Sequence, residues 1–184
     1  MSEQEAPGGL GLVQAFVNTA DLPVGPDELG DPPGAAEWIR RLGGDAATIS
    51  PAERTRLVGV REALRDLLEA HTGKNVAGEP RVRLQKLLGK ASLTPVVDAF
   101  GPSLVPAHTS GVDGFLALLS AAIVEAGYRG TWERLKVCRA DTCRYAFYDE
   151  SKNGRGHWCS MKVCGTREKA RSYRARKKES AAVE

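Results

Sequence analysis

The sequence predicts a mainly α (α+β) protein: a helical N-terminal domain with one small β-hairpin, followed by a small treble-clef-like zinc module. Three observations predict this. Apolar residues recur at helical spacing through most of residues 10–128, four cysteines form two pairs near the C-terminus, and basic residues follow them. With 184 residues, 42% of them hydrophobic, the chain can hold one packed domain and a small module.

The helical domain is predicted over residues 1–129, with a loose polar tail at 1–9. Apolar residues recur three and four positions apart, which predicts helices over residues 10–20, 35–42, 51–71, 79–90 and 112–128. The strongest helix start is Ser50-Pro51-Ala52-Glu53. There Ser50 can cap the helix, Pro51 fits its first turn and Glu53 completes a capping box.

A small β-hairpin is expected between residues 93 and 108. Two short β-prone runs flank the turn signal Gly101-Pro102. Pro95 and Pro106 lack a backbone N–H, so they cannot donate to a neighbouring strand. Both strands are therefore expected to be edge strands.

All four cysteines of the chain lie in the predicted module at residues 130–178: Cys138, Cys143, Cys159 and Cys164. Each pair encloses four residues, and fifteen residues separate the pairs. This spacing is typical of a zinc site, because a tetrahedral ion needs thiolates that approach from two directions. We expect one structural Zn²⁺ with four thiolate ligands and no open position. His157 is the alternative ligand.

The order predicted for the module is knuckle, hairpin, second knuckle and helix. Tyr145 and Phe147 alternate with smaller or polar residues, as in a strand, and Asn153-Gly154 is a turn signal. His157-Trp158 is expected to lead back as the second strand. The run 166–178 contains good helix formers and neither Gly nor Pro, and residues 179–184 form a tail.

Charge is divided unevenly along the chain. Residues 1–128 carry 11 Lys and Arg against 16 Asp and Glu, whereas residues 129–184 carry 15 against 7. An acidic body with a basic C-terminal part is typical of nucleic-acid-binding proteins. The residues expected to contact nucleic acid are Lys152, Arg155, Arg167, Lys169, Arg171, Arg174, Arg176, Lys177 and Lys178.

The predicted C-terminal helix carries a basic stripe. Basic residues stand at positions i, i+4, i+7 and i+11 from Arg167, which places them on one face. Such a stripe suits phosphate oxygens or a major groove, and phosphate contact is the first expectation because it supplies most affinity. Ala170 and Tyr173 lie on another face and are expected to pack against the zinc module.

Other functional classes find little support in the sequence. No run approaches the roughly 18 apolar residues of a membrane helix, and the acidic N-terminus lacks a signal-peptide core. We therefore expect a cytoplasmic protein without a membrane partner, whose clustered cysteines bind metal. No catalytic pattern stands out, and the histidines at 71, 108 and 157 have no catalytic spacing, so an enzyme is not expected.

The C-terminal sequence resembles the CGNR zinc finger, and the upstream part is similar to the ABATE domain that accompanies it, mainly in bacteria. In the finger the matching stretches are Cys138-x4-Cys143, Trp158-Cys159-Ser160-Met161-x-x-Cys164-Gly165-x-Arg167-x-Lys169-Ala170 and Tyr173-Arg174-x-Arg176. In the body they are Phe16-Val17-Asn18-Thr19, Trp38 and Arg61-Glu62-Ala63-Leu64, with Leu84-Gln85 where the family usually has Leu-Asn.

This resemblance implies a stress-responsive transcription regulator that binds DNA. Its helical body would sense a small-molecule effector or form a homodimer. One residue departs from the family motif Cys-Gly-Asn-Arg, because Thr166 stands in place of Asn. A threonine can cap the following helix, so the fold is expected to survive, whereas a direct contact made by the Asn would be lost.

Some alternatives stay open at this point. Asn18, Thr19 and Arg61 are candidates for an effector pocket, although a helix-end or turn role is the alternative for the first two. The module could also bind RNA or dock its basic helix on an acidic protein. The aromatic residues that would stack on RNA bases are Tyr145, Phe147, Tyr148 and Trp158.

Overall fold

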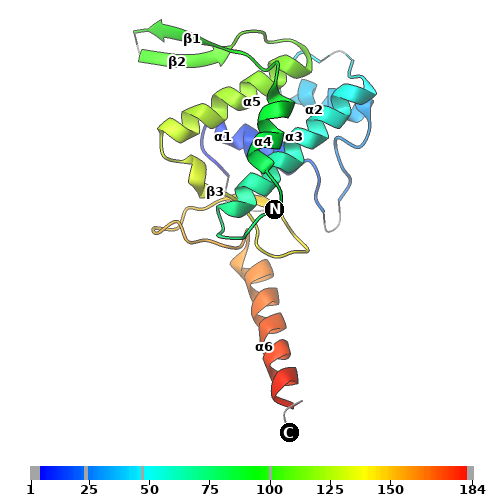
Figure 1. Ribbon diagram of the computed structural model, residues 1–184, viewed down its shortest axis with the longest axis vertical. Coiled ribbons are helices and arrows are strands. Elements are labelled where there is room, and N and C mark those ends of the chain that lie inside the picture. The colour runs from blue at the N-terminus through cyan, green and yellow to red at the C-terminus, as the bar shows by residue number, and fades with distance from the viewer. Residues whose placement is uncertain (1–4, 23–24, 47, 100, 182–184) are drawn as a thin grey trace.

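The computed structural model describes residues 5–22, 25–46, 48–99 and 101–181, with side chains up to residue 177. It confirms a mainly helical chain with two small hairpin-like sheets and a small C-terminal module (Figure 1). The helices are α1 Leu10–Val17, α2 Pro32–Arg41, α3 Pro51–Ala70, α4 Pro80–Leu88, α5 Gly111–Tyr128, the 3₁₀ turn η1 Trp132–Arg134, the π-helical turn η2 Met161–Gly165 and α6 Thr166–Ala181. The strands are β1 Leu93–Asp98, β2 Gly101–Pro106, β3 Leu135–Val137 and β4 Ala146–Tyr148. The outer parts of the two predicted tails, 1–4 and 182–184, lie outside the described residues.

The central helix α3 begins as the sequence predicts. The Ser50 hydroxyl accepts a hydrogen bond from the Glu53 backbone at 3.3 Å, and the Glu53 carboxylate accepts one from the Ser50 backbone at 2.8 Å. These two bonds satisfy backbone donors that the first helical turn leaves free. Further along, Leu57, Val60 and Leu68 are fully buried.

Three aromatic rings join the other helices of the body. Phe16 of α1, Trp38 of α2 and Phe115 of α5 contact one another, with ring centroids 5.4 to 5.8 Å apart. Tilted and edge-to-face pairs at this distance add to the energy of burial itself. The rings therefore lock together three helices that are distant in the sequence.

Helix α5 differs from one expectation. It has 18 residues with a mean hydropathy of 1.3, so by length and composition alone it could cross a membrane. Two acidic residues near its ends interrupt the apolar run, so the sequence alone does not suggest a membrane-spanning helix. In the structure 44% of it is buried, and Phe115 and Leu119 pack in the core. Core helices of globular proteins meet the same criterion.

The predicted hairpin is confirmed as β1 and β2, which pair antiparallel from Leu93 with Pro106 to Asp98 with Gly101. Gly101 and Pro102, which the sequence predicts as its turn, instead begin β2. The pair forms a separate two-stranded sheet, so both strands are edges as expected. Figure 1 shows the hairpin reaching out beyond α5 at the end of the molecule opposite α6.

The prediction for the second hairpin names the wrong partner strand. Strand β4 pairs antiparallel with β3, which precedes the first cysteine, and residues 157–158 form no strand. Burial explains the difference, since Leu135, Val137 and Ala146 all lie in the core that the body helices form. The Asn153-Gly154 turn does exist, closed by a 3.1 Å bond from the Gly154 N–H to the Ser151 carbonyl.

This sheet attaches the C-terminal part to the body. Strand β3 lies against α3, and β4 lies against α1. The boundary predicted near residue 130 falls between α5 and η1, yet the strands just beyond it share the hydrophobic core of the body.

Candidate metal centre and nucleic-acid interface

The four cysteine thiols converge on one point. Their sulfur atoms all lie within 4.8 Å of one another. Cys159 Sγ lies 3.7 Å from both Cys143 Sγ and Cys164 Sγ. Sulfurs about 2.3 Å from a tetrahedral zinc are about 3.8 Å apart, so the spacing fits that ion. Among the described residues, His157 is not part of the cluster.

Two knuckles bring these thiols together. Cys138 directly follows β3, and its N–H donates to the Tyr145 carbonyl at 2.8 Å. Cys143 closes the first knuckle through a 2.8 Å bond from its N–H to the Ala140 carbonyl. The second knuckle runs into η2, where the Ser160 hydroxyl accepts from the Val163 N–H at 3.3 Å. The ligands thus approach from two directions, as their spacing predicts.

The thiols share their protons unequally. Hydrogen bonds from Cys143 and Cys159 lower the pKa of Cys138 to about 2, and the bond to Cys138 raises the pKa of Cys143 to about 12. Burial raises the pKa of Cys164. The four cysteines would hold the ion as thiolates, and zinc binding would release their remaining protons.

A buried ion pair that was not predicted from the sequence lies beside the loop that joins β4 to the second knuckle. Lys136 Nζ lies 2.7 Å from Asp149 Oδ2, and the side chains are only 4% and 3% exposed. Lys136 also donates to the Gly154 carbonyl at 2.6 Å, while Asp149 accepts from the Gly156 N–H at 2.7 Å. The pair therefore fixes the loop that leads from β4 to the second knuckle. A lysine between two apolar neighbours in β3 is the signal that the sequence offers.

The basic helix α6 projects from the zinc module away from the body (Figure 1). All six basic side chains described on it are exposed: Arg167, Lys169, Arg171, Arg174, Arg176 and Lys177. The side chain of Lys178 lies outside the described ones. Ala170 and Tyr173 are exposed as well, Tyr173 to 63%, so the prediction that they pack on the module is wrong. The reason is that α6 contacts chiefly η2, its own preceding turn.

Two of the predicted contact residues are engaged within the chain. Arg171 lies 2.8 Å from the Glu168 carboxylate and 3.7 Å from that of Asp141. Arg174 Nε donates to the Ala170 carbonyl at 3.2 Å. Away from α6, Lys152 and Arg155 are exposed on the loop after β4.

Thr166 acts differently from the prediction. Its hydroxyl donates to the Met161 carbonyl at 3.2 Å, and its backbone is helical. The cap of this segment is Ser160, because η2 runs on into α6 without a break. Thr166 is the first residue of α6, but its side chain stabilises the preceding π-helical turn and does not cap the helix.

A family model described as "Putative stress-induced transcription regulator" (ABATE) matches residues 10–127, more than half of the chain. The chain belongs to the ABATE family. A second model, described as "CGNR zinc finger", matches residues 134–177, which include all four cysteines. The CGNR finger thus holds a single zinc site made by these cysteines. The ABATE description is that of a transcription regulator and not of an enzyme family. No curated protein matches the chain.

In the ABATE body, Asn18 binds the finger. Its amide oxygen accepts from the Ala146 N–H at 2.7 Å, and its amide nitrogen donates to the Ala146 carbonyl at 2.9 Å. The Asn18 side chain therefore forms the same pair of hydrogen bonds with the β4 backbone that a residue of a neighbouring strand would form. Arg65 adds a second link, because it is fully buried and donates to the Arg144 carbonyl at 2.8 Å and to the Val17 carbonyl at 2.6 Å.

Thr19 and Arg61 are likewise used inside the ABATE body. Thr19 donates its hydroxyl proton to the Phe16 carbonyl at 2.8 Å, a helix-end role. Arg61 is buried and forms a two-point ion pair with Asp27, at 2.5 and 2.9 Å. Burial alone would raise the pKa of Asp27, but the hydrogen bonds from Arg61 and from the Leu29 N–H outweigh it and lower that pKa.

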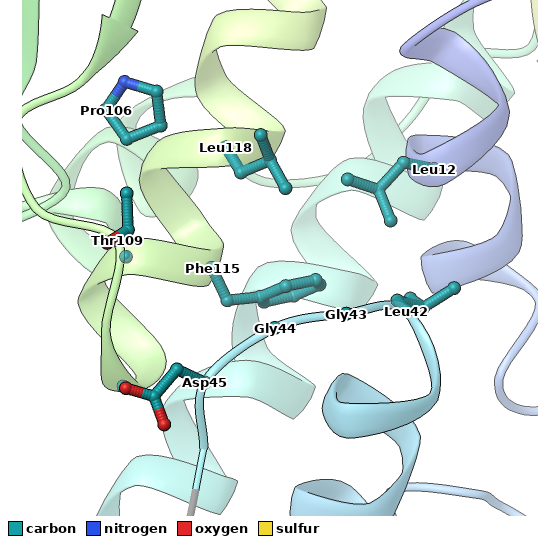
Figure 2. A pocket seen from close by; sticks show the side chains of 11 residues that line it. Leu12, Leu42, Gly43, Gly44, Asp45, Pro106, Thr109, Phe115 and Leu118 are labelled. Atoms are coloured by element: carbon teal, nitrogen blue, oxygen red, sulfur yellow. The ribbon is translucent and has the colours of Figure 1, made fainter.

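The main described cavity of the ABATE body lies elsewhere. It measures about 210 Å³ and opens between α1, the turn after α2, the end of β2 and α5. Figure 2 shows Leu12, Phe115 and Leu118 pointing into it, with Asp45 at one side. Asn18, Thr19 and Arg61 do not line this cavity, although Arg61 Nη1 donates to the Thr19 hydroxyl at 3.2 Å.

Proposed function

We propose that the protein is a transcription regulator that uses its zinc finger to bind DNA, with α6 as the main contact. The observation that carries this proposal is the exposed, projecting basic helix beginning directly at the second zinc knuckle. Its 16 residues correspond to a rod about 24 Å long, and a major groove about 12 Å wide admits such a rod.

The charges on α6 suit a helix lying between two DNA strands. At 100° per residue, Arg167 and Arg174 share one side, while Lys169 and Arg176 lie on roughly the opposite side. A helix inside a groove meets phosphates on both walls, whereas a helix lying on a flat acidic surface uses one side only. This distribution supports DNA over an acidic protein partner.

The aromatic residues support duplex DNA over single-stranded RNA. Phe147 is buried beside the zinc ligands, and Tyr145, Tyr148 and Trp158 are half-buried. Base stacking needs an open ring face. Phe147 and Trp158 instead pack beside the zinc ligands in the small core of the finger, and Tyr148 packs against the core of the body.

Zinc-loaded full-length protein and a duplex chosen from a random DNA pool provide the test. Fluorescence anisotropy between 50 and 300 mM salt should give a log–log slope of about −0.9 per phosphate neutralised. Replacing Arg167 and Arg174 with Ala should weaken binding and make the slope about 1.8 shallower. The matched control is Arg81→Ala with Lys86→Ala on the exposed surface of α4. It should leave the affinity and the salt slope unchanged.

Binding that does not depend on salt would contradict the proposal. Equal losses of DNA affinity in the two double variants would also contradict it. Single-stranded RNA of the same length serves as competitor. If it displaced the duplex at equal concentration, the assignment to DNA would fall.

A further inference from the structure

The β1–β2 hairpin has one face made only of apolar residues. In the observed register Leu93 pairs with Pro106, Pro95 with Leu104 and Val97 with Pro102. Paired residues and every second residue along a strand share a face, so these six side chains lie together. The other face carries Thr94, Asp98 and Ser103 together with Val96 and Val105. The first face is therefore the more apolar of the two, and the body covers part of it.

The body covers only the base of this face. Leu93, Leu104 and Pro106 are half-buried near α5, whereas Pro95, Val97 and Pro102 are exposed, and Val97 is 80% exposed. A two-stranded hairpin alone is at best marginally stable, and an exposed apolar patch usually marks an interaction site. The apolar residues Pro95, Val97 and Pro102 are therefore left uncovered by the part of the chain that the structure describes.

An apolar groove lies at the foot of the same hairpin. It is the cavity of about 210 Å³ in Figure 2, bounded by Leu12, Phe115 and Leu118 and by Pro106 at the end of β2. Small-molecule sites commonly measure about 300–1,000 Å³, so this one suits a protein side chain better. Both Leu42 and Leu118 on its rim are exposed.

Charge points to a second copy of the chain as the partner. Residues 91–112 contain a single charged side chain, Asp98, in a protein with 26 Lys and Arg and 23 Asp and Glu. Two identical acidic bodies repel each other, and this segment lets them approach with the least repulsion. An acidic or basic partner of another kind would find no complementary charge here.

The prolines select the way in which two copies meet. Pro95, Pro102 and Pro106 remove N–H donors from the hairpin, which disfavours the addition of a further strand at its edges. A face-to-groove contact needs no such donors. The 12 strand residues and the 10 further residues that line the groove also match the roughly 20–30 residues a side of a stable interface.

We propose that the protein forms a twofold dimer in which the hairpin tip of each copy, around Val97, seats in the groove beside Leu118 of the other. Six residues of strand span about 20 Å, so two hairpins lying antiparallel bring each tip to the foot of its neighbour. The contact is self-complementary, as a closed twofold dimer requires. It involves neither the zinc site nor α6.

Sedimentation equilibrium of the zinc-loaded full chain without DNA tests the proposal. The wild type should show twice the chain mass of 19.7 kDa at micromolar concentrations. Val97→Asp and Leu118→Lys should each shift the protein to monomer, with circular dichroism unchanged because both positions are exposed. Val82→Asp, at an exposed apolar position on α4, is the matched control and should remain dimeric.

Mixing the two monomeric variants gives the decisive result. In the mixed dimer one contact joins the introduced carboxylate to the introduced ammonium group, and the other contact keeps the native pair, so the mixture should regain the dimer mass. A wild type that is monomeric at about 100 µM, well above the micromolar range of ordinary dimers, would overturn the proposal. So would a dimer that survives Val97→Asp or a mixture that stays monomeric. DNA binding should stay intact in the monomeric variants, since the interface is independent of α6.

Discussion

Lys136 Nζ and Asp149 Oδ2 lie 2.7 Å apart, with both side chains almost completely buried behind the zinc knuckles. Lys136 stands two residues before the first zinc ligand, and Asp149 directly follows β4. The pair ties both ends of the short sheet to the loop that reaches the second knuckle. Metal geometry in the finger therefore depends on a charge pair that does not touch the metal.

Removing one partner of this pair should destabilise the protein strongly. Lys136→Met leaves the Asp149 carboxylate buried without its cation, which typically costs about 3–5 kcal/mol. Guanidinium denaturation of the zinc-loaded protein measures this. The control is Glu37→Gln, which breaks an exposed pair with Arg40 and should cost less than about 1 kcal/mol. Similar losses in the two variants would refute a structural role for the buried pair.

Gly156→Ala should disturb the same pair from the other side. A Cβ at Gly156 would stand 2.6 to 3.0 Å from the Asp149 carboxyl group, which is pinned by Lys136 and cannot withdraw. We expect a lower midpoint of thermal unfolding and weaker zinc retention. Gly127→Ala in α5 is the comparison, because nothing lies within 4 Å of that position. That variant should instead gain about 0.5–1 kcal/mol.

The Asp27–Arg61 pair gives the body a defined response to acid. The pKa of Asp27 is lower in the folded protein than its ordinary value of 3.8. Its contribution to stability is therefore complete above about pH 4 and is lost as the pH falls through the folded value. Urea denaturation of wild type and Asp27→Asn should show a gap in unfolding free energy that narrows below about pH 4. A gap that stays constant down to about pH 2 would mean that Asp27 is not the titrating group.

Loss of the metal should loosen the body as well as the finger. Cys164→Ser removes a ligand, and such modules draw an apparent free energy of folding of about 10–16 kcal/mol from zinc. We expect zinc content to fall from one ion per chain to near zero. Hydrogen exchange should then rise in β4 and at the end of α1, because Asn18 pairs with Ala146. Unchanged exchange in α1 would show that the finger folds independently of the body.

The arginines of α6 should not contribute equally to DNA binding. Arg171 has to exchange its carboxylate partners Glu168 and Asp141 for a phosphate, whereas Arg167 is exposed and forms no ion pair with any residue that the structure describes. Arg171→Ala should therefore weaken binding less than Arg167→Ala in the same anisotropy assay. Asp141→Asn should strengthen DNA binding slightly, because it removes one of the carboxylate partners of Arg171. The reverse ranking would place Arg171 at the centre of the interface.

Local signals make much of the fold predictable. Ser50, Pro51 and Glu53 encode a helix start within four residues, and two neighbouring β-prone runs encode the hairpin, although Gly101 and Pro102 begin β2 and do not form its turn. The cysteines identify the zinc site because ligand spacing is itself a local property. In each case the interacting residues lie close together in the sequence, so their pattern determines the structure.

The predictions fail where contacts between residues distant in the sequence determine the structure. The partner of β4 is not evident from the sequence, because the choice depends on burying Leu135 and Ala146 against α1 and α3. Arginine side chains are ordinarily exposed, yet the guanidinium of Arg65 satisfies the Val17 carbonyl, 48 positions away, and the Arg144 carbonyl, 79 positions away. Tyr173 is predicted to join a core that α6 never reaches. No periodicity or motif carries information of this kind.

The pairing of Asn18 with Ala146 limits how this architecture can be rearranged. Asn18 and Ala146 are far apart in the chain, but the surfaces around them are complementary. A finger joined to a different body would keep its metal site and its basic helix. Its β4 backbone would lose the hydrogen bonds that the Asn18 side chain, at the end of α1, donates and accepts. A body separated from its finger would open its core to water at the place of Leu135 and Val137. A change on one side of this contact therefore needs a matching change on the other if both hydrogen bonds between Asn18 and Ala146 are to be kept.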